Sequence, residues 1–301
     1  MITRVTQRAV TQTSLQGLYG NLRAVNKLQQ QLSSGKVISM PSDDPTGTNK
    51  ALLTRQALSG NAQQTRNITD GQNLLATTDS TLQSMVTGVQ KVRDLTVQAL
   101  NGGALDAASL QDIATQVTGL RQTLLGAANT VAQGRPVFGG ITSGSTAYDT
   151  NGKYVGVGDG TNPATAVNRR VSDVEAIRAD ITGPEAFGSP TSGKDLFAVT
   201  ANIAADVGDT AKLRGDLSDL DAVLQKMTTA LADVGTRAAR MDAAAQVNST
   251  QQLNLTSVQS QTEDIDVAKT IMNLQVQQNA YQAALSATAK SITPSLVDFL
   301  Q

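Results

Sequence analysis

The chain has 301 residues, with no Cys, no His and no Trp, and its 24 basic residues nearly balance 25 acidic ones. Without His and Cys, the commonest metal ligands, nucleophiles and proton carriers are absent, so the sequence disfavours most enzyme classes and predicts no catalytic residue, cofactor or metal. A formal net charge of -1 offers no electrostatic footprint for nucleic acid or for an anionic membrane surface. The first residues lack the apolar segment of a cleaved signal peptide, and no run of apolar residues is long enough to insert into a membrane.

Apolar residues spaced by three and four predict a helix at each end of the chain. Polar residues such as Gln29, Gln278 and Thr288 interrupt both apolar seams, so these helices would bury poorly in a closed monomer. We therefore expect helices from other copies to complete them. The expected assembly positions are Leu15, Leu18, Leu22, Val25 and Leu32 in the first helix, and Val267, Ile271, Leu274, Tyr281, Leu285 and Ile292 in the last.

A short break follows the first helix. Gly35 can adopt the left-handed conformation that closes a helix, and Lys36 suits the negative end of the helix dipole. The residue before Pro41 is biased towards an extended conformation, because the proline ring disfavours the helical region for its neighbour. Asp44 can then cap a second helix, in which Pro45 occupies the first position and needs no donor.

The body of the chain shows further helical periodicity on both sides of a segment with a different composition. The most regular seven-residue repeat predicts a buried rod core at Leu213, Leu217, Leu220, Leu224, Met227 and Leu231. Residues 141–200 are rich in Gly, Thr, Ser and Asn, and Asn151–Gly152 is a strong hairpin signal. We expect a mainly α fold. The two halves of the chain would form an elongated antiparallel helical bundle or coiled coil that carries a small β-rich inserted domain.

This pattern predicts three parts. Residues 1–40 and 265–301 form the terminal helices, residues 41–140 and 201–264 form a helical rod domain, and residues 141–200 form an outer insert. Because the insert offers little apolar surface, we expect it to face outward and to be removable without unfolding the rod.

Acidic residues lie near the ends of the predicted helices. Asp43 and Asp44 could form a metal or catalytic pair, but the proline beside them favours helix capping. Glu263, Asp264 and Asp266 are expected in the first turn of the last helix, where the dipole favours negative charge.

Five motifs give the chain a resemblance to bacterial flagellar axial proteins of the flagellin group, and within it to the hook-filament junction family, also called hook-associated protein three. LSSGK at 32–36, PSDDP at 41–45 and the segment 262–290 that begins TEDIDVAKT are similar to flagellins in general. QGRPVFGG at 133–140 and SLVDFL at 295–300 are similar to the junction family in particular. The resemblance covers residues 1–140 and 200–301.

The resemblance implies a structural subunit of the extracellular flagellum that is exported unfolded, without a cleaved signal peptide. It also implies partners: copies of the chain itself, hook-associated protein one below, flagellin above and a flagellar export chaperone. The terminal helices would form the inner coiled-coil core of the tube. Pro294 predicts that the last helix ends or kinks near Thr293.

Three alternatives stand beside this interpretation. A flagellin subunit of the filament is the nearest one. A cytoplasmic coiled-coil adaptor would explain the heptads, but not the hairpin insert or the paired terminal motifs. GSPTSGKD at 188–195 has the glycine and lysine spacing of a phosphate-binding loop, but Asp195 stands where magnesium binding needs Ser or Thr.

Overall fold

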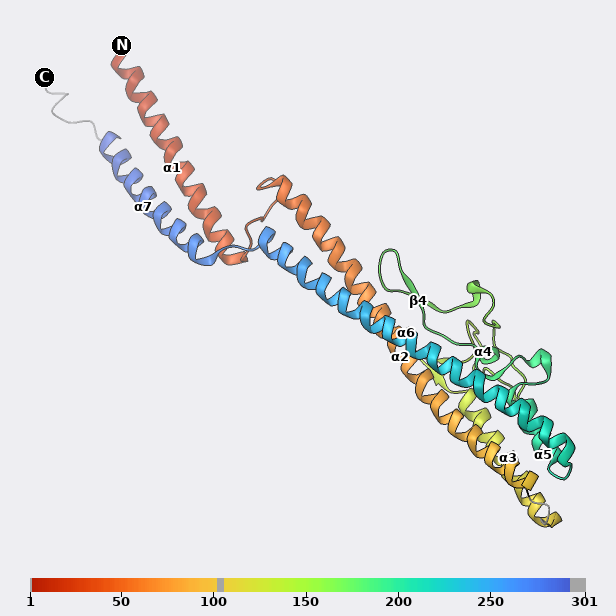
Figure 1. Cartoon of the computed structure of the whole chain (residues 1–301). Helices are drawn as coiled ribbons and strands as arrows, with labels where there is room; N and C mark the ends of the chain where they lie inside the picture. The colour runs from red at the N-terminus through yellow and green to blue at the C-terminus, as the bar shows by residue number, and fades with distance from the viewer. Residues whose placement is uncertain (1, 102–105, 293–301) are drawn as a thin grey trace. The chain divides into compact units, whose positions relative to one another are not determined.

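The computed structural model describes residues 2–101 and 106–292, and seven α-helices make up most of this part (Figure 1). The chain divides into two compact units. The terminal unit comprises residues 1–60 and 252–301, and the central unit comprises residues 61–251. No helix in the described ranges combines the length and the apolar character needed to cross a membrane. The mainly α class predicted from the periodicity is confirmed.

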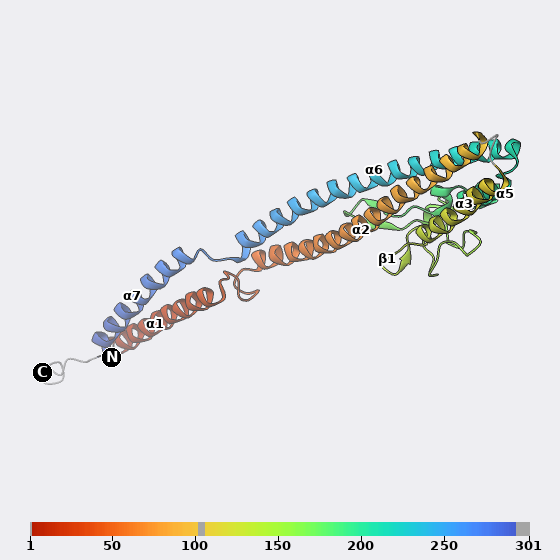
Figure 2. The same cartoon turned by 90° about the horizontal axis from the view of Figure 1, so that it is seen from below.

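Two helices from opposite ends of the chain lie side by side in the terminal unit. They are α1 (Ile2–Ser34) and α7 (Val267–Ile292), and they pack against each other along much of their length (Figures 1 and 2). The first connector, residues 35–44, leads from α1 to α2, and the second connector, residues 264–266, leads from α6 to α7. Pro294 and the segment 295–300 lie outside the described residues.

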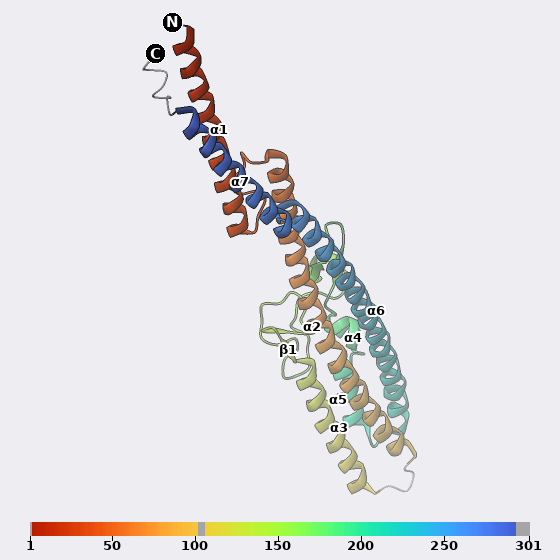
Figure 3. The same cartoon turned by 90° about the vertical axis from the view of Figure 1, so that its left-hand side faces the viewer.

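The two longest helices, α2 (Pro45–Asn101) and α6 (Thr210–Glu263), continue from the terminal unit into the central unit. In the central unit they are joined by α3 (Ala107–Ala128) and α5 (Leu196–Asp206), which pack on each other (Figure 3). Asp106 caps α3, and Asp195 caps α5 by accepting from two backbone amides of its first turn. The unit is therefore a helical bundle.

Short strands and turns fill the chain between α3 and α5. A hairpin with two-residue strands pairs β1 (Val131–Ala132) with β2 (Arg135–Pro136). A second hairpin, with three-residue strands, pairs β3 (Asn168–Arg170) with β4 (Ala176–Arg178), and both are antiparallel. The turn predicted at Asn151–Gly152 joins two tyrosines that form an isolated antiparallel bridge, and Gly152 has φ 86°. The other elements are η1 (Pro163–Thr165), α4 (Gly183–Phe187) and η2 (Pro190–Ser192).

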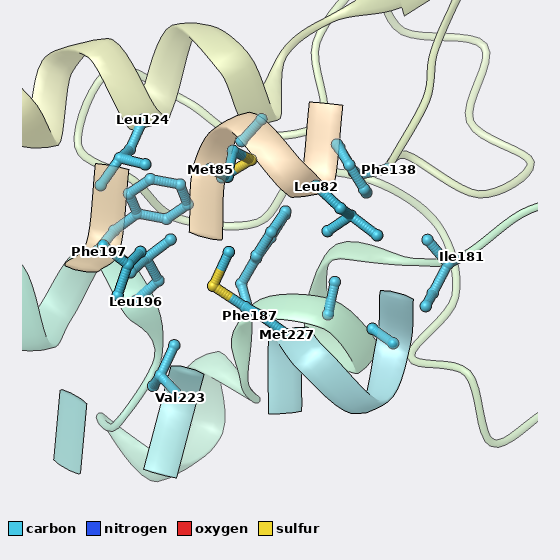
Figure 4. Packing of buried hydrophobic residues seen from close by; sticks show 14 of the residues in the cluster. Leu82, Met85, Leu124, Phe138, Ile181, Phe187, Leu196, Phe197, Val223 and Met227 are labelled. Carbon is cyan, nitrogen blue, oxygen red and sulfur yellow. The ribbon is translucent and has the colours of Figure 1, made fainter. Parts of the chain in front are cut away.

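The hydrophobic core of the central unit is shared by the helices and by the segment predicted as an outer insert. Phe187 on α4 is fully buried, and its ring centroid lies 4.9 Å from that of Phe138. Tyr148 packs edge-on against Phe197 of α5 at 4.8 Å. Figure 4 shows Phe187 among side chains of α2 and α6, close to Met85 and Met227.

The expectation that residues 141–200 lie outside the core is therefore wrong. The average composition of this segment is polar, and Val155, Val157 and Val174 are exposed, but several of its other large apolar residues are buried in the core. A handful of aromatic and aliphatic side chains contributes a large buried area even where most of the surrounding residues are polar. The residues of this segment that belong to the hydrophobic core are Ala147, Tyr148, Val171, Ile177, Ala179, Ile181, Ala186, Phe187, Leu196, Phe197 and Val199.

The six rod-core positions predicted on α6 are unequally buried. Leu213, Leu220 and Met227 are buried, whereas Leu217, Leu224 and Leu231 are half-buried. Three residues outside the predicted set, Val223, Ala230 and Val234, complete the buried face.

Candidate assembly surface and joint

The α1 and α7 helices share an inner face whose residues recur at alternating spacings of three and four. Asn21 and Gln277 meet in this face, where the Gln277 side-chain amide donates to Asn21 Oδ1 at 3.0 Å. The seam is therefore only partly apolar, as expected for helices that need further partners. Its buried and half-buried members are Ser14, Leu18, Asn21, Val25, Leu28 and Leu32 on α1, and Thr270, Leu274, Gln277, Tyr281, Ala284 and Thr288 on α7.

Five of the ten predicted assembly positions whose side chains are described lie outside this inner face. A second set of apolar side chains remains exposed, including Tyr19 at 61% and Val276 at 66%. We name this set the outer strip: Leu15, Tyr19 and Leu22 on α1, and Val267, Ile271, Met272, Val276 and Leu285 on α7. The side chain of Ile292 lies outside the described part of the chain.

The α1 part of the outer strip has the spacing of a helix-binding face, whereas its α7 members lie on two sides of that helix. Leu15, Tyr19 and Leu22 follow one another at intervals of four and three on α1, which places them on one side of the helix. Exposed apolar groups that share one side of a helix mark interaction sites more often than isolated ones do. The outer strip is the feature of the terminal unit best suited to bind further helices.

The two connectors of the terminal unit meet in a short backbone bridge. Val37 N–H donates to the Glu263 carbonyl at 2.7 Å, and Ile265 N–H donates to the Gly35 carbonyl at 3.1 Å. Gly35 has φ 71°, a left-handed conformation that a residue with a side chain rarely adopts. We refer to this meeting point, together with the charged side chains around it, as the joint.

Two basic residues neutralise the acidic residues of the joint. Arg55 of α2 donates from Nε and Nη2 to the two carboxylate oxygens of Glu263, at 2.9 and 2.8 Å. Lys36 contacts Asp264 at 2.5 Å and Glu263 at 3.5 Å. The hydrogen bonds from Arg55 lower the pKa of Glu263 despite its burial, and those from Lys36 lower the pKa of Asp264.

The acidic residues near α7 correct one prediction made from the sequence. Glu263 is the last residue of α6 and Asp264 lies in the second connector, so neither occupies the first turn of α7. Asp266 does cap α7, because its Oδ1 accepts the Lys269 amide at 3.0 Å. Sequence reasoning missed Arg55, which lies far from Glu263 in the chain and carries no local signal of the pairing.

The first connector is held by its own aspartates. Asp44 Oδ1 accepts the Gly47 amide at 2.9 Å, and α2 begins at Pro45. Asp43 Oδ2 instead accepts the backbone amides of Ser39 and Met40, the two residues before the exposed Pro41. The pKa of Asp43 is lowered chiefly by a hydrogen bond from Lys27. Both carboxylates are occupied by structural hydrogen bonds.

The hydrogen bonds around residues 188–195 in the central unit argue against the phosphate-binding loop considered above. A phosphate-binding loop needs free backbone amides at the start of the following helix. Asp195 Oδ1 already accepts those of Phe197 and Ala198, at 3.0 and 3.1 Å, and the Lys194 ammonium binds Asp219 at 2.8 Å. Across the described residues, no group of three or more acidic side chains is arranged to hold a metal ion.

Comparison with known proteins finds two family models that match the helical N-terminal and C-terminal parts of the chain. The bacterial flagellin N-terminal helical region matches residues 5–142, and the bacterial flagellin C-terminal helical region matches residues 217–300. Flagellar hook-associated protein 3 of Escherichia coli K12 is 28% identical, over 94% of this chain and 95% of that protein. Flagellin of Bacillus subtilis 168 is 29% identical, over 88% of each chain.

A solved structure shows the same fold. The flagellar hook associated protein-3 of Legionella pneumophila superimposes with a TM-score of 0.60 at 13% identity, covering 69% of this chain and 98% of that one. The paired terminal helices, the long rod helices and the two matched regions lead to one conclusion: the chain belongs to the bacterial flagellin family.

Proposed function

We propose that this chain is a structural axial subunit of the bacterial flagellum that forms the junction between the hook and the filament. The outer strip carries this proposal, because it leaves an apolar face on the paired terminal helices of a flagellin-family chain. The similarity to hook-associated protein 3 over nearly the whole length of both chains favours the junction over the filament itself. The family is structural, and we propose no enzymatic activity.

Assembly would proceed by burial of the outer strip against terminal helices of neighbouring copies. Removing one large, fully exposed apolar side chain from water contributes about 1.5–3 kcal/mol, and the outer strip offers several partly exposed side chains to offset the cost of association. The faces offered by α1 and α7 differ from each other, so contacts between copies would be heterologous and would generate a ring or a helical array.

The same proposal includes specific binding partners. Residues 1–40 and 265–301 would form the inner core of the tube, with copies of the chain itself as their first partners. Hook-associated protein one would lie on one side and flagellin on the other, after export outside the cell with the help of a flagellar export chaperone. These partners are supported by the family resemblance.

Point variants on the outer strip test the proposal. Val276→Asp places a charge on an exposed apolar position of α7, while Gln275→Asp places the same charge on its exposed polar neighbour. Each is expressed in a motile bacterium that lacks its own junction protein but carries the other axial proteins. We expect Val276→Asp to abolish filament growth and Gln275→Asp to retain it. Equal growth with both variants would refute the assembly role of the outer strip.

A flagellin subunit of the filament is the second candidate, favoured by the similarity to the Bacillus subtilis protein over most of its length. The two candidates differ in copy number, because a junction needs one short layer and a filament needs thousands of subunits. Quantifying the chain in sheared flagella, relative to the main filament protein, separates them.

A further inference from the structure

Glu263 lies at a place in the joint where its ionised form is electrostatically unfavourable. It is the last residue of α6, and its side chain is only 3% exposed. A carboxylate at the C-terminal end of a helix meets the negative end of the helix dipole, and burial also disfavours a charged group. The ionised form of Glu263 therefore depends on basic residues that other segments supply.

Two segments supply them. The Arg55 guanidinium forms a two-pronged, charge-assisted pair with both oxygens of Glu263, and Lys36 lies between Glu263 and Asp264. Arg55 of α2 and Lys36 of the first connector are the charged partners that the described part of the chain presents to Glu263, and Asp264 of the second connector shares Lys36 with it. The nearby Lys27–Asp43 pair belongs to the bend of the first connector.

The same residues carry the backbone bridge between the connectors. Glu263 accepts the Val37 amide through its carbonyl, and Lys36 lies between the two residues of its connector that take part in the bridge. Loss of the side-chain pairs would thus act directly on the two backbone hydrogen bonds. We propose that the joint is an acid-sensitive clasp, in which ionised Glu263 holds the two connectors together through Arg55 and Lys36 and protonated Glu263 releases them.

The direction of the pH effect follows from the hydrogen bonds. Arg55 holds the pKa of Glu263 below its usual 4.5, and Lys36 holds that of Asp264 below its usual 3.8. A carboxyl group whose pKa is lowered by folding stabilises the folded form above its unfolded pKa. That contribution is lost as the pH falls through the lower pKa of the folded state. The clasp should be closed at neutral pH and should open below about pH 4.5.

Hydrogen exchange of the two bridging amides tests the clasp in the full chain. The measured quantity is the protection factor of the Val37 and Ile265 amides, so the intrinsic pH dependence of exchange is removed. In the wild type, we expect protection to fall severalfold between pH 6 and pH 3.5, because the carboxylates of the joint lose their charge over this range. Glu263→Gln, which keeps the shape but not the charge, should show low protection at both pH values.

Asp221→Asn is the matched control, because Asp221 forms a comparable ion pair with Arg93 in the central unit, at 2.7 Å. It should leave both bridging amides unchanged. If Glu263→Gln retains full protection at pH 6 and shows the same fall at low pH as the wild type, the clasp is refuted. If circular dichroism shows that this variant has lost its helices, titration of the Glu263 carboxyl by NMR in the wild type decides instead. A pKa below 4.5 supports the clasp, and one at or above it overturns the proposal.

Discussion

Phe187→Ala tests whether the segment 141–200 is part of the folded core of the central unit. Phe187 is fully buried and its ring lies against those of Phe138, Tyr148 and Phe197. Truncating a buried Phe to Ala removes its transfer free energy and leaves a cavity, at a cost of about 3–5 kcal/mol. For a unit of this size, each kcal/mol lowers the melting temperature by about 2–4 °C, so we expect a decrease of about 6–20 °C.

Thermal unfolding followed by circular dichroism at 222 nm measures this change, and urea denaturation gives the free energy independently. Val174→Ala is the control, because Val174 lies in the turn between β3 and β4 of the same segment and is 98% exposed. Its effect should stay within about 0.5 kcal/mol. A Phe187→Ala chain that melts with the wild type would show that the segment folds apart from the helices. In that case, Phe187 would not belong to a core shared with the helices.

Three further predictions concern the central unit. Asp195→Ala removes the cap of α5 and should lower the free energy of unfolding by about 1–2 kcal/mol in urea titrations, whereas no change would mean that solvent replaces the cap. Lys194→Ala breaks only an exposed pair with Asp219, so it should cost less than about 0.5 kcal/mol, and calorimetry should detect no ATP binding with or without the change. Burial opposes the charge of Glu185, but hydrogen bonds from Arg178 outweigh it and lower its pKa. The contribution of ionised Glu185 to the free energy of unfolding should therefore be fully present above about pH 4.5 and be lost on further acidification. In urea titrations from pH 7 to pH 3, Glu185→Gln should show a smaller decrease in the free energy of unfolding than the wild type.

The helical part of the fold could be predicted because its signals are local. The repeat from Leu213 to Leu231 specifies a buried face within one helix, and Gly35 and Asp44 mark helix ends through the conformation or hydrogen bond that each can supply. Such signals do not require knowledge of which other segments pack nearby.

The remaining features depend on contacts between distant parts of the chain. Phe187 and Tyr148 stand in stretches of polar composition, so averaging over a window hides the two side chains that join the core. Arg55 and Glu263 are separated by 208 positions, and the sequence around each residue gives no signal of the pairing. The inner and outer faces of α1 and α7 could not be distinguished either, because both are marked by apolar residues at helical spacing and only the packing of one helix on the other decides between them.

Electron microscopy of hooks and filaments labelled for this chain tests the central claim most directly. Because the chain has no Cys, an exposed position such as Val174 can be changed to Cys and tagged without competing thiols. We expect one short layer of label between the end of the hook and the start of the filament. Label distributed along the whole filament would contradict this expectation and would assign the chain to the filament instead.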